Sequence, residues 1–138
     1  MIFQHTFQVK TQGRGTVNIT PLLENLPARS GIENGICNIF IRHTSASLIL
    51  CENADPDVRG DIEVFLSKLV PDGDAAYQHR TEGPDDMAAH IRSILTNSSL
   101  TLPVSKGCFV LGEWQGIYLY EHRYAPHNRS VFVTIYGE

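Results

Sequence analysis

The sequence predicts a fold of the α/β class, more closely α+β. The chain is expected to form a single compact domain over residues 1–138, with a largely antiparallel or mixed sheet and about three short helices. Three observations predict this fold. Extended patterns fill both ends of the chain, and the two longer helical patterns are confined to its middle. The third is composition, since 42% hydrophobic and 19% charged residues are typical of a globular protein. A chain of this length buries roughly 70% of the surface that it exposes when unfolded.

The N-terminal residues alternate between apolar and polar side chains. In residues 2–11 one face carries Phe3, His5, Phe7 and Val9, which indicates a half-buried strand. Gly13 and Gly15 interrupt it and residues 16–19 are extended again, so the two segments are expected to form a hairpin. Thr20 followed by Pro21 predicts the start of a short helix.

Two nearly continuous apolar runs, at residues 36–42 and 45–51, predict central strands. A helix is expected from Asp57 to the residue before Pro71. Its apolar residues fall at helical spacing: Val58, Ile62, Phe65, Leu66 and Leu69.

A polar loop at residues 71–84 leads to a second helix, which Asp85 or Asp86 is expected to cap. The buried stripe predicted for this helix is Met87, Ile91, Ile94 and Leu95. The remaining chain reads as four strands, at residues 99–104, 107–112, 116–121 and 130–136.

The net charge of −4 argues against a nucleic acid or an anionic membrane surface as partner. No apolar run approaches the roughly 20 residues of a membrane-spanning helix, and the N-terminus lacks the features of a signal peptide. Three cysteines without a CxxC pair, Cys37, Cys51 and Cys108, are typical of reduced, buried thiols. We expect a cytoplasmic protein.

The stretch from His43 to Asp61 concentrates polar chemistry after an apolar run. His43 is followed by His79 and His90 downstream, and three imidazoles could surround one divalent cation. The spacing matches no established metal motif, and histidines satisfied by backbone partners are the alternative. Imidazoles favour zinc, whereas nearby carboxylates favour magnesium, and the sequence leaves both open.

The acidic residues Glu52 and Asp61 are candidate catalytic groups or ligands of a hard cation that meets a substrate phosphate. The alternative is that Asp55 or Asp57 caps the following helix and that the other acids lie on a solvated face, and for Asp57 we favour this alternative. Asn53 follows Glu52 at the end of an apolar strand, where site residues are common.

Trp114 and Gln115 lie between two glycines and could form a flat platform with an amide for a substrate ring. A core indole at a strand crossing is the alternative. Arg129 is the candidate partner of a phosphate or of a site carboxylate. Thr44 and Ser45 are better hydrogen-bond donors than nucleophiles, because no GxSxG elbow is present.

The order and spacing of these motifs resemble the YjbQ family over essentially the whole chain. The resemblance is carried by motifs around the histidines, by Gly112-Glu-Trp-Gln-Gly116, by Glu121-His-Arg123 and by the terminal Gly137-Glu138. One departure is Glu113, which stands where the family often has threonine. The resemblance implies a compact α/β domain that assembles as a homotrimer, with sites near the subunit boundaries.

The resemblance also implies activity as a secondary thiamine-phosphate synthase. Such a transferase joins hydroxymethylpyrimidine diphosphate and thiazole phosphate and releases pyrophosphate, as a main or a side activity. The implied family residues are the histidines His43, His79 and His90, the acids Glu52, Asp61 and Glu121, and Trp114 with Gln115. A metal-dependent hydrolase of small phosphorylated compounds and a non-catalytic metal- or metabolite-binding protein are the alternatives that the residues leave open.

Overall fold

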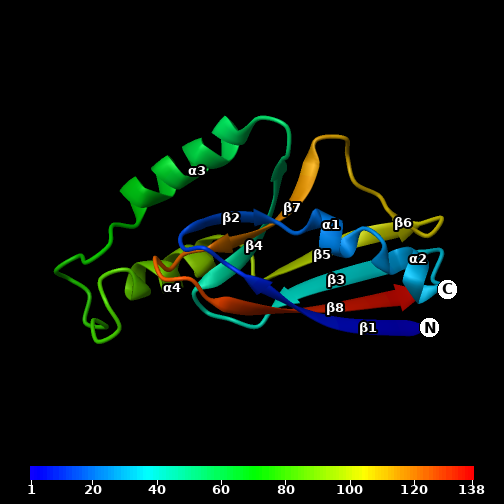
Figure 1. Cartoon of the computed structure of the whole chain (residues 1–138), viewed down its shortest axis with the longest axis horizontal. Coiled ribbons are helices and arrows are strands. Elements are labelled where there is room, and N and C mark those ends of the chain that lie inside the picture. Colours follow the sequence, from blue (N-terminus) through cyan, green and yellow to red (C-terminus); the bar gives the residue numbers. More distant parts are fainter.

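The computed structural model describes residues 1–138 and shows a single α+β domain in which every strand pair is antiparallel (Figure 1). The strands are β1 (Ile2–Lys10), β2 (Gly15–Asn18), β3 (Gly35–Ile41), β4 (Ala46–Glu52), β5 (Ser99–Ser105), β6 (Cys108–Phe109), β7 (Gln115–Glu121) and β8 (Asn128–Gly137). The helices are α1 (Thr20–Leu23), α2 (Leu26–Ser30), α3 (Pro56–Leu69) and α4 (Asp86–Leu95). The helix predicted after Thr20 is divided into α1 and α2.

The strands form two sheets, one with the order β1-β8-β3-β5-β6 and one with the order β2-β7-β4. Aliphatic side chains from both sheets make one core, which includes Ile39, Leu48, Leu119 and Val133. The predicted alternation of the N-terminal strand is confirmed, because Val9 is buried and Phe3 and Phe7 pack against the core. Each sheet therefore exposes one face and gives the other to the core.

The predicted N-terminal hairpin is wrong, because β1 pairs with β8 in one sheet and β2 pairs with β7 in the other. The connection between them is fixed by Arg14, which donates to both carboxylate oxygens of Asp72 and to the carbonyl of His122. Of the two predicted central strands, β3 is central, but β4 pairs only with β7 and lies at a sheet edge.

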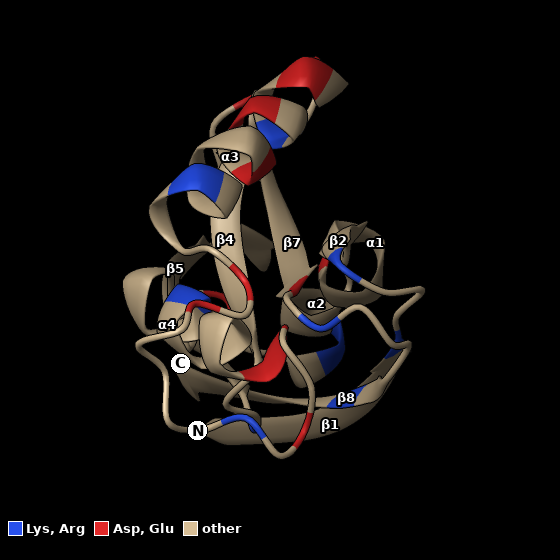
Figure 2. Cartoon of the chain, turned by 90° about the vertical axis from the view of Figure 1, so that its left-hand side faces the viewer, with Lys and Arg blue, Asp and Glu red and all other residues tan.

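Helix α3 begins and ends within one residue of the prediction, and the Asp55 side chain caps it by accepting from the N–H of Asp57. Its predicted apolar stripe is only partly buried: Leu66 is 6% exposed, whereas Phe65 is 64% exposed. Figures 1 and 2 show why, since α3 projects beyond the body of the molecule beside the free ends of β4 and β7. It therefore meets only a small second core.

Helix α4 has the predicted bounds but the opposite orientation. Ile94 is 81% exposed and Leu95 is 54% exposed, so the predicted buried stripe is wrong at these positions. The buried residues of this helix are Asp86, Ala88, Ala89 and Arg92. Charged residues lie inward because their partners do: Asp86 meets Arg123, and Arg92 meets His122 and Glu63.

All three cysteines are free. Cys37 is buried and Cys51 is half-buried, but Cys108 is exposed, so the expectation of three buried thiols is wrong for Cys108. This residue lies in the two-residue edge strand β6, where little of the fold covers it. No helix in the structure combines the length and the apolar character that crossing a membrane requires.

Candidate functional site

Two of the three predicted histidines meet at the start of α4. His79 comes from the loop before the helix, and Asp86 and His90 are one turn apart on the helix itself. The Nε2 atoms of His79 and His90 lie 2.7 Å and 3.2 Å from the same oxygen, Oδ2 of Asp86. One ligand atom from each of the three residues lies within 4.8 Å of the others. This is a candidate metal centre.

The hydrogen bonds of His90 fix where its protons lie. Its Nδ1 is 3.0 Å from the backbone oxygen of Thr44, and a carbonyl can only accept, so Nδ1 carries a proton. In a neutral ring Nε2 then presents a lone pair to a carboxylate oxygen, which is repulsive. Either a second proton or a metal ion must lie between them. Metal-binding histidines commonly donate their second N–H to a backbone carbonyl in this way.

The Asp86 side chain is held in place by an ion pair with Arg123. Its side chain is 2% exposed, and Nη1 of Arg123 contacts its second oxygen at 2.9 Å. Arg123 also donates from Nε to Asp85. Burial raises the pKa of Asp86, but the hydrogen bond from His79 and the charges of His90 and Arg123 more than offset this and hold it below its usual range. The carboxylate is therefore ionised at neutral pH, as a metal ligand must be.

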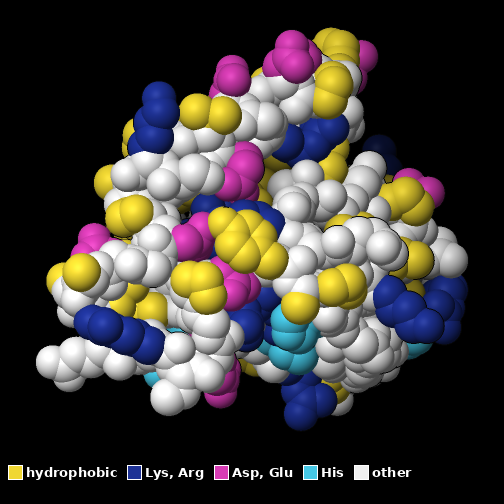
Figure 3. Space-filling model, turned by 60° about the vertical axis from the view of Figure 1, so that its left-hand side comes forward, with side chains coloured by type: hydrophobic (Ala, Val, Ile, Leu, Met, Phe, Trp, Pro, Cys, Tyr) yellow, Lys and Arg dark blue, Asp and Glu magenta, His cyan; other side chains and the backbone are white.

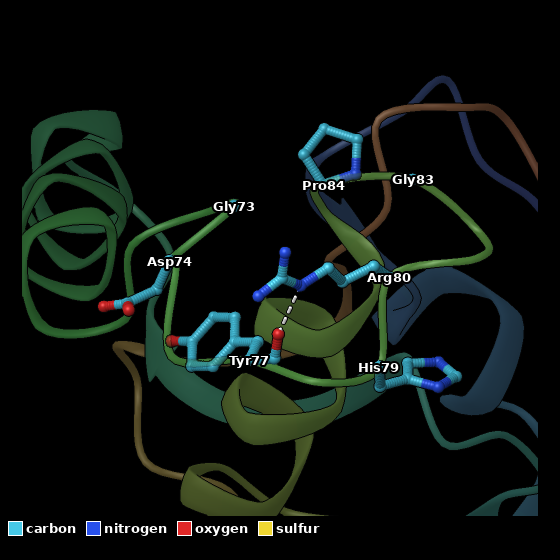
Figure 4. Close-up of a pocket in the computed structure, with 7 residues that line it drawn as sticks. All are labelled: Gly73, Asp74, Tyr77, His79, Arg80, Gly83 and Pro84. Atoms are coloured by element: carbon cyan, nitrogen blue, oxygen red, sulfur yellow. Dashed lines mark hydrogen bonds between the residues drawn. The ribbon is translucent and has the colours of Figure 1, made fainter.

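A pocket of about 220 Å³ lies on the loop side of the cluster and is lined by Gly73, Asp74, Tyr77, His79, Arg80, Gly83 and Pro84 (Figure 4). The guanidinium of Arg80 lies inside the loop and donates to the carbonyls of Tyr77 and Ala75. The His79 ring turns away from that guanidinium (Figure 4). Arg80 thus holds the loop that carries His79.

A larger hollow of about 510 Å³ lies on the other side of the cluster, and both His43 and His90 line it. His43 follows β3, and its Nε2 accepts the backbone N–H of Ser130 at 2.7 Å. The structure therefore groups His79 and His90 with Asp86 and leaves His43 outside that group, in the wall of the hollow. We call His43, Thr44, His79, Asp86 and His90 the histidine end of the molecule.

Acidic, basic and histidine side chains all reach the face of the molecule drawn in Figure 3. Behind the hollow, the predicted residues Ser45, Glu121 and Arg129 form a buried group. Arg129 pairs with the carboxylate of Glu121 and donates to the hydroxyl of Ser45 at 3.0 Å. Glu121 also accepts from Thr11 at 2.7 Å. These contacts connect β7 and β8 with Ser45, which directly precedes β4 and follows the hollow residue Thr44.

The chain matches the model of the family described as UPF0047 protein YjbQ-like over residues 5–138. A UPF0047 protein of Synechocystis is 47% identical over 135 residues, which cover 98% of this chain and 92% of that protein. The UPF0047 protein YjbQ of Salmonella typhimurium is 45% identical over 142 residues and the full length of both chains.

The chain belongs to the YjbQ-like UPF0047 family.

Solved structures agree. The fold is similar to a hypothetical protein of Aeropyrum pernix, with a TM-score of 0.89, 28% identity and 99% of each chain covered. It is also similar to a conserved hypothetical protein of Thermus thermophilus, with a TM-score of 0.84, 33% identity, and 96% of this chain and 99% of that chain covered.

In this member of the YjbQ-like family, the other predicted site residues lie at the far end of β4 and β7. Glu52, Asn53, Trp114 and Gln115 form what we call the tryptophan end. It is joined by the pairing of Glu52 with Gln115 and by the Asn53 N–H, which donates to the Trp114 carbonyl. Asp61 is exposed on α3. A strand of seven residues extends roughly 20 Å, so within one chain this end does not meet the histidines.

Asp86 was not predicted from the sequence as a candidate ligand, nor Arg123 as its ion-pair partner. A signal was available, because Asp86 and His90 are four residues apart on a helix and must share a face. The sequence pattern instead predicts that Asp85 or Asp86 caps the helix. The structure shows no side-chain cap at this terminus.

Proposed function

We propose that this protein is a metal-dependent enzyme that acts on small phosphorylated compounds. The observation that carries the proposal is the pair of imidazole Nε2 atoms on one buried carboxylate oxygen, with the Nδ1 of His90 tied to a carbonyl. Two imidazoles and one carboxylate suit zinc better than magnesium and would leave a position open for substrate, as in catalytic zinc sites. A divalent ion held there would supply positive charge to a phosphate oxygen.

The surrounding residues have defined tasks in this proposal. Thr44 fixes the tautomer of His90 through its carbonyl, and Arg123 keeps Asp86 ionised and oriented. His43 accepts from a backbone N–H at Nε2, so its remaining proton is on Nδ1 and can be donated to a substrate oxygen.

The specific reaction we propose is the thiamine-phosphate synthase reaction, in which hydroxymethylpyrimidine diphosphate and thiazole phosphate are joined and pyrophosphate is released. The family resemblance motivates it. The arrangement of the site supports it, because hollows of about 220 and 510 Å³ flank the cluster, and a coupling reaction needs room for two substrates. The activity can be the main function or a side activity of the same site.

The test is to incubate purified protein with zinc or magnesium and both substrates, and to measure thiamine phosphate chromatographically. We expect product at a rate well above that of a His43→Ala, His90→Ala double variant. Equal rates for the two proteins would reject the synthase reaction.

A second candidate is a metal-dependent hydrolase of small phosphorylated compounds. The exposure of the cluster favours it, since the His79 side chain is 44% exposed and that of His90 is 29% exposed, so water reaches both rings. Release of inorganic phosphate from single substrates, without coupling of the two halves, would identify the hydrolase. Thermal stabilisation by substrate without turnover would instead identify a binding protein.

We also propose a homotrimer, in which the tryptophan end of one subunit lies near the histidine end of the next. Exposed apolar side chains supply a surface for assembly, among them Phe65 on α3, Ile94 on α4 and Trp114. Native mass spectrometry should give three chains, and Phe65→Asp should shift the mass toward one chain. The unpaired cysteines favour a reducing compartment, so we propose the cytoplasm.

A further inference from the structure

The larger hollow has an unusual lining for a pocket beside a candidate cation site, because no acidic side chain reaches it. It is lined by His43, Thr44, His90, Ser93, Ile94, Thr96 and Ser98. Four of these side chains carry hydroxyl groups, and imidazoles supply the other polar atoms. A wall of neutral donors without carboxylates suits an anionic ligand and disfavours a second cation.

His43 lines this hollow with its tautomer fixed. The Ser130 N–H occupies Nε2 at 2.7 Å, which leaves the proton on Nδ1. Burial lowers the pKa of His43, and the charges of Arg129, His127 and Arg42 lower it further against the opposing effect of Glu121. The ring is therefore neutral at pH 7. The same positive neighbours that disfavour an imidazolium would favour an anion at this position.

Ser93 carries the one buried hydroxyl in the lining of the hollow that lacks a hydrogen-bond partner. Its Oγ has less than 1 Å² of exposed surface and no hydrogen bond, alone among the buried side-chain oxygens and nitrogens of the protein. It lies three residues after His90 on α4, so the two side chains share a face of the helix. An unpaired buried hydroxyl is unfavourable, and a rotation about χ1 that turns it into the hollow would let it donate to a ligand oxygen.

We propose that this hollow is a phosphoryl-binding subsite, in which Ser93, Thr44 and the Nδ1–H of His43 donate to phosphate oxygens next to His90. The subsite rests on the proposed function only in the identity of the molecule that carries the phosphoryl group. Three donors in the lining of one hollow match the three outer oxygens of such a group better than the two of a carboxylate.

Inorganic phosphate is the probe, added to the purified protein at constant ionic strength with chloride as reference, and the shift in melting temperature gives its Kd. The variants are Ser93→Ala and the control Ser105→Ala, which removes the same atom from an exposed serine of β5. We expect Ser93→Ala to weaken phosphate binding by about tenfold or more. Ser105→Ala should match the wild type.

Without phosphate, Ser93→Ala should be at least as stable as the wild type, because alanine favours the helix and removes an unpaired hydroxyl. A merely structural serine would lose stability instead. Wild-type protein that binds no phosphate, or Ser93→Ala that binds it equally well, would overturn the subsite. Metal content measured on the same samples separates the two proposals, because metal-free protein with Ser93-dependent phosphate binding would contradict only the metal-dependent function.

Discussion

The two ends of the β4–β7 pair share the same strands but are stabilised in different ways. At the histidine end and directly behind it, charged side chains are buried and partnered: Asp86 is 2% exposed, and Arg92, on the same helix, is fully buried. At the tryptophan end, backbone and turn contacts dominate, and Trp114 is 57% exposed. Buried polar groups need fixed partners, whereas exposed ones do not. The polar side chains of the histidine end are therefore fixed by their partners, whereas Trp114 at the tryptophan end is exposed to solvent.

A closed ring of hydrogen bonds lies behind the histidine end. Nε of Arg92 donates to Nδ1 of His122, so the His122 proton is on Nε2, which faces the Ser47 hydroxyl at 2.8 Å. The hydroxyls of Ser47 and Thr96 are 2.6 Å apart, and Thr96 donates back to the Arg92 carbonyl. Ser47 and His122 resemble a catalytic pair, but the tautomer is wrong for a general base and both are fully buried.

The largest difference between the ends is expected from the loss of a buried arginine. Arg92→Met removes the partner of His122 and of Glu63, and should lower the free energy of unfolding by about 3–5 kcal/mol. Arg59→Met, which removes a half-buried arginine that donates to the Glu52 carbonyl, should cost about 1 kcal/mol or less. Urea denaturation at pH 7 measures both. Equal losses would contradict the contrast between the ends.

Metal binding should depend on one end only. Asp86→Asn keeps the size of the side chain but removes the charge shared by the two histidines, and should weaken zinc binding by about a hundredfold or more. Asp57→Asn changes an exposed acid near the tryptophan end and should have no effect. Competition with a chromophoric zinc chelator gives both affinities. A loss in both variants would mean that zinc binds through diffuse surface charge.

Acid should loosen the histidine end first. Burial, and then the charge of Arg92, lowers the pKa of His122 from 6.5 to about 2. Below pH 6.5 the unfolded chain therefore binds one more proton than the folded chain. The contribution of neutral, buried His122 to the free energy of unfolding is present above pH 6.5 and is lost as the pH falls toward 2. The slope is about 1.4 kcal/mol per pH unit. Stability measured from pH 7.5 to 5 should fall in the wild type and less steeply in His122→Gln.

The smallest effect is expected at the tip of the tryptophan end. Trp114→Ala removes a side chain that is 57% exposed and should change the unfolding free energy of a single chain by less than about 0.5 kcal/mol. Its effect should appear in assembly, measured by sedimentation below micromolar concentration. A large loss of stability in a monomeric sample would show that the indole belongs to the core.

The alternation in β1 and the bounds of α3 were predictable because both are local patterns. The orientation of α4 was not, because it depends on Arg92 meeting His122, thirty residues away. The association of His79 with His90 was predictable in outline, whereas the separation of Glu52 and Trp114 from them depends on the length and pairing of β4. Sequence motifs that lie close together in the chain can lie at opposite ends of the domain when a single strand such as β4 runs between them.

The most direct test of the metal centre is anomalous X-ray scattering at the zinc edge from crystals of wild-type protein grown with zinc. A zinc site predicts one strong peak about 2.1 Å from Nε2 of His79, Nε2 of His90 and an oxygen of Asp86. Crystals without a peak there, in which His90 still contacts Asp86 directly, would contradict it.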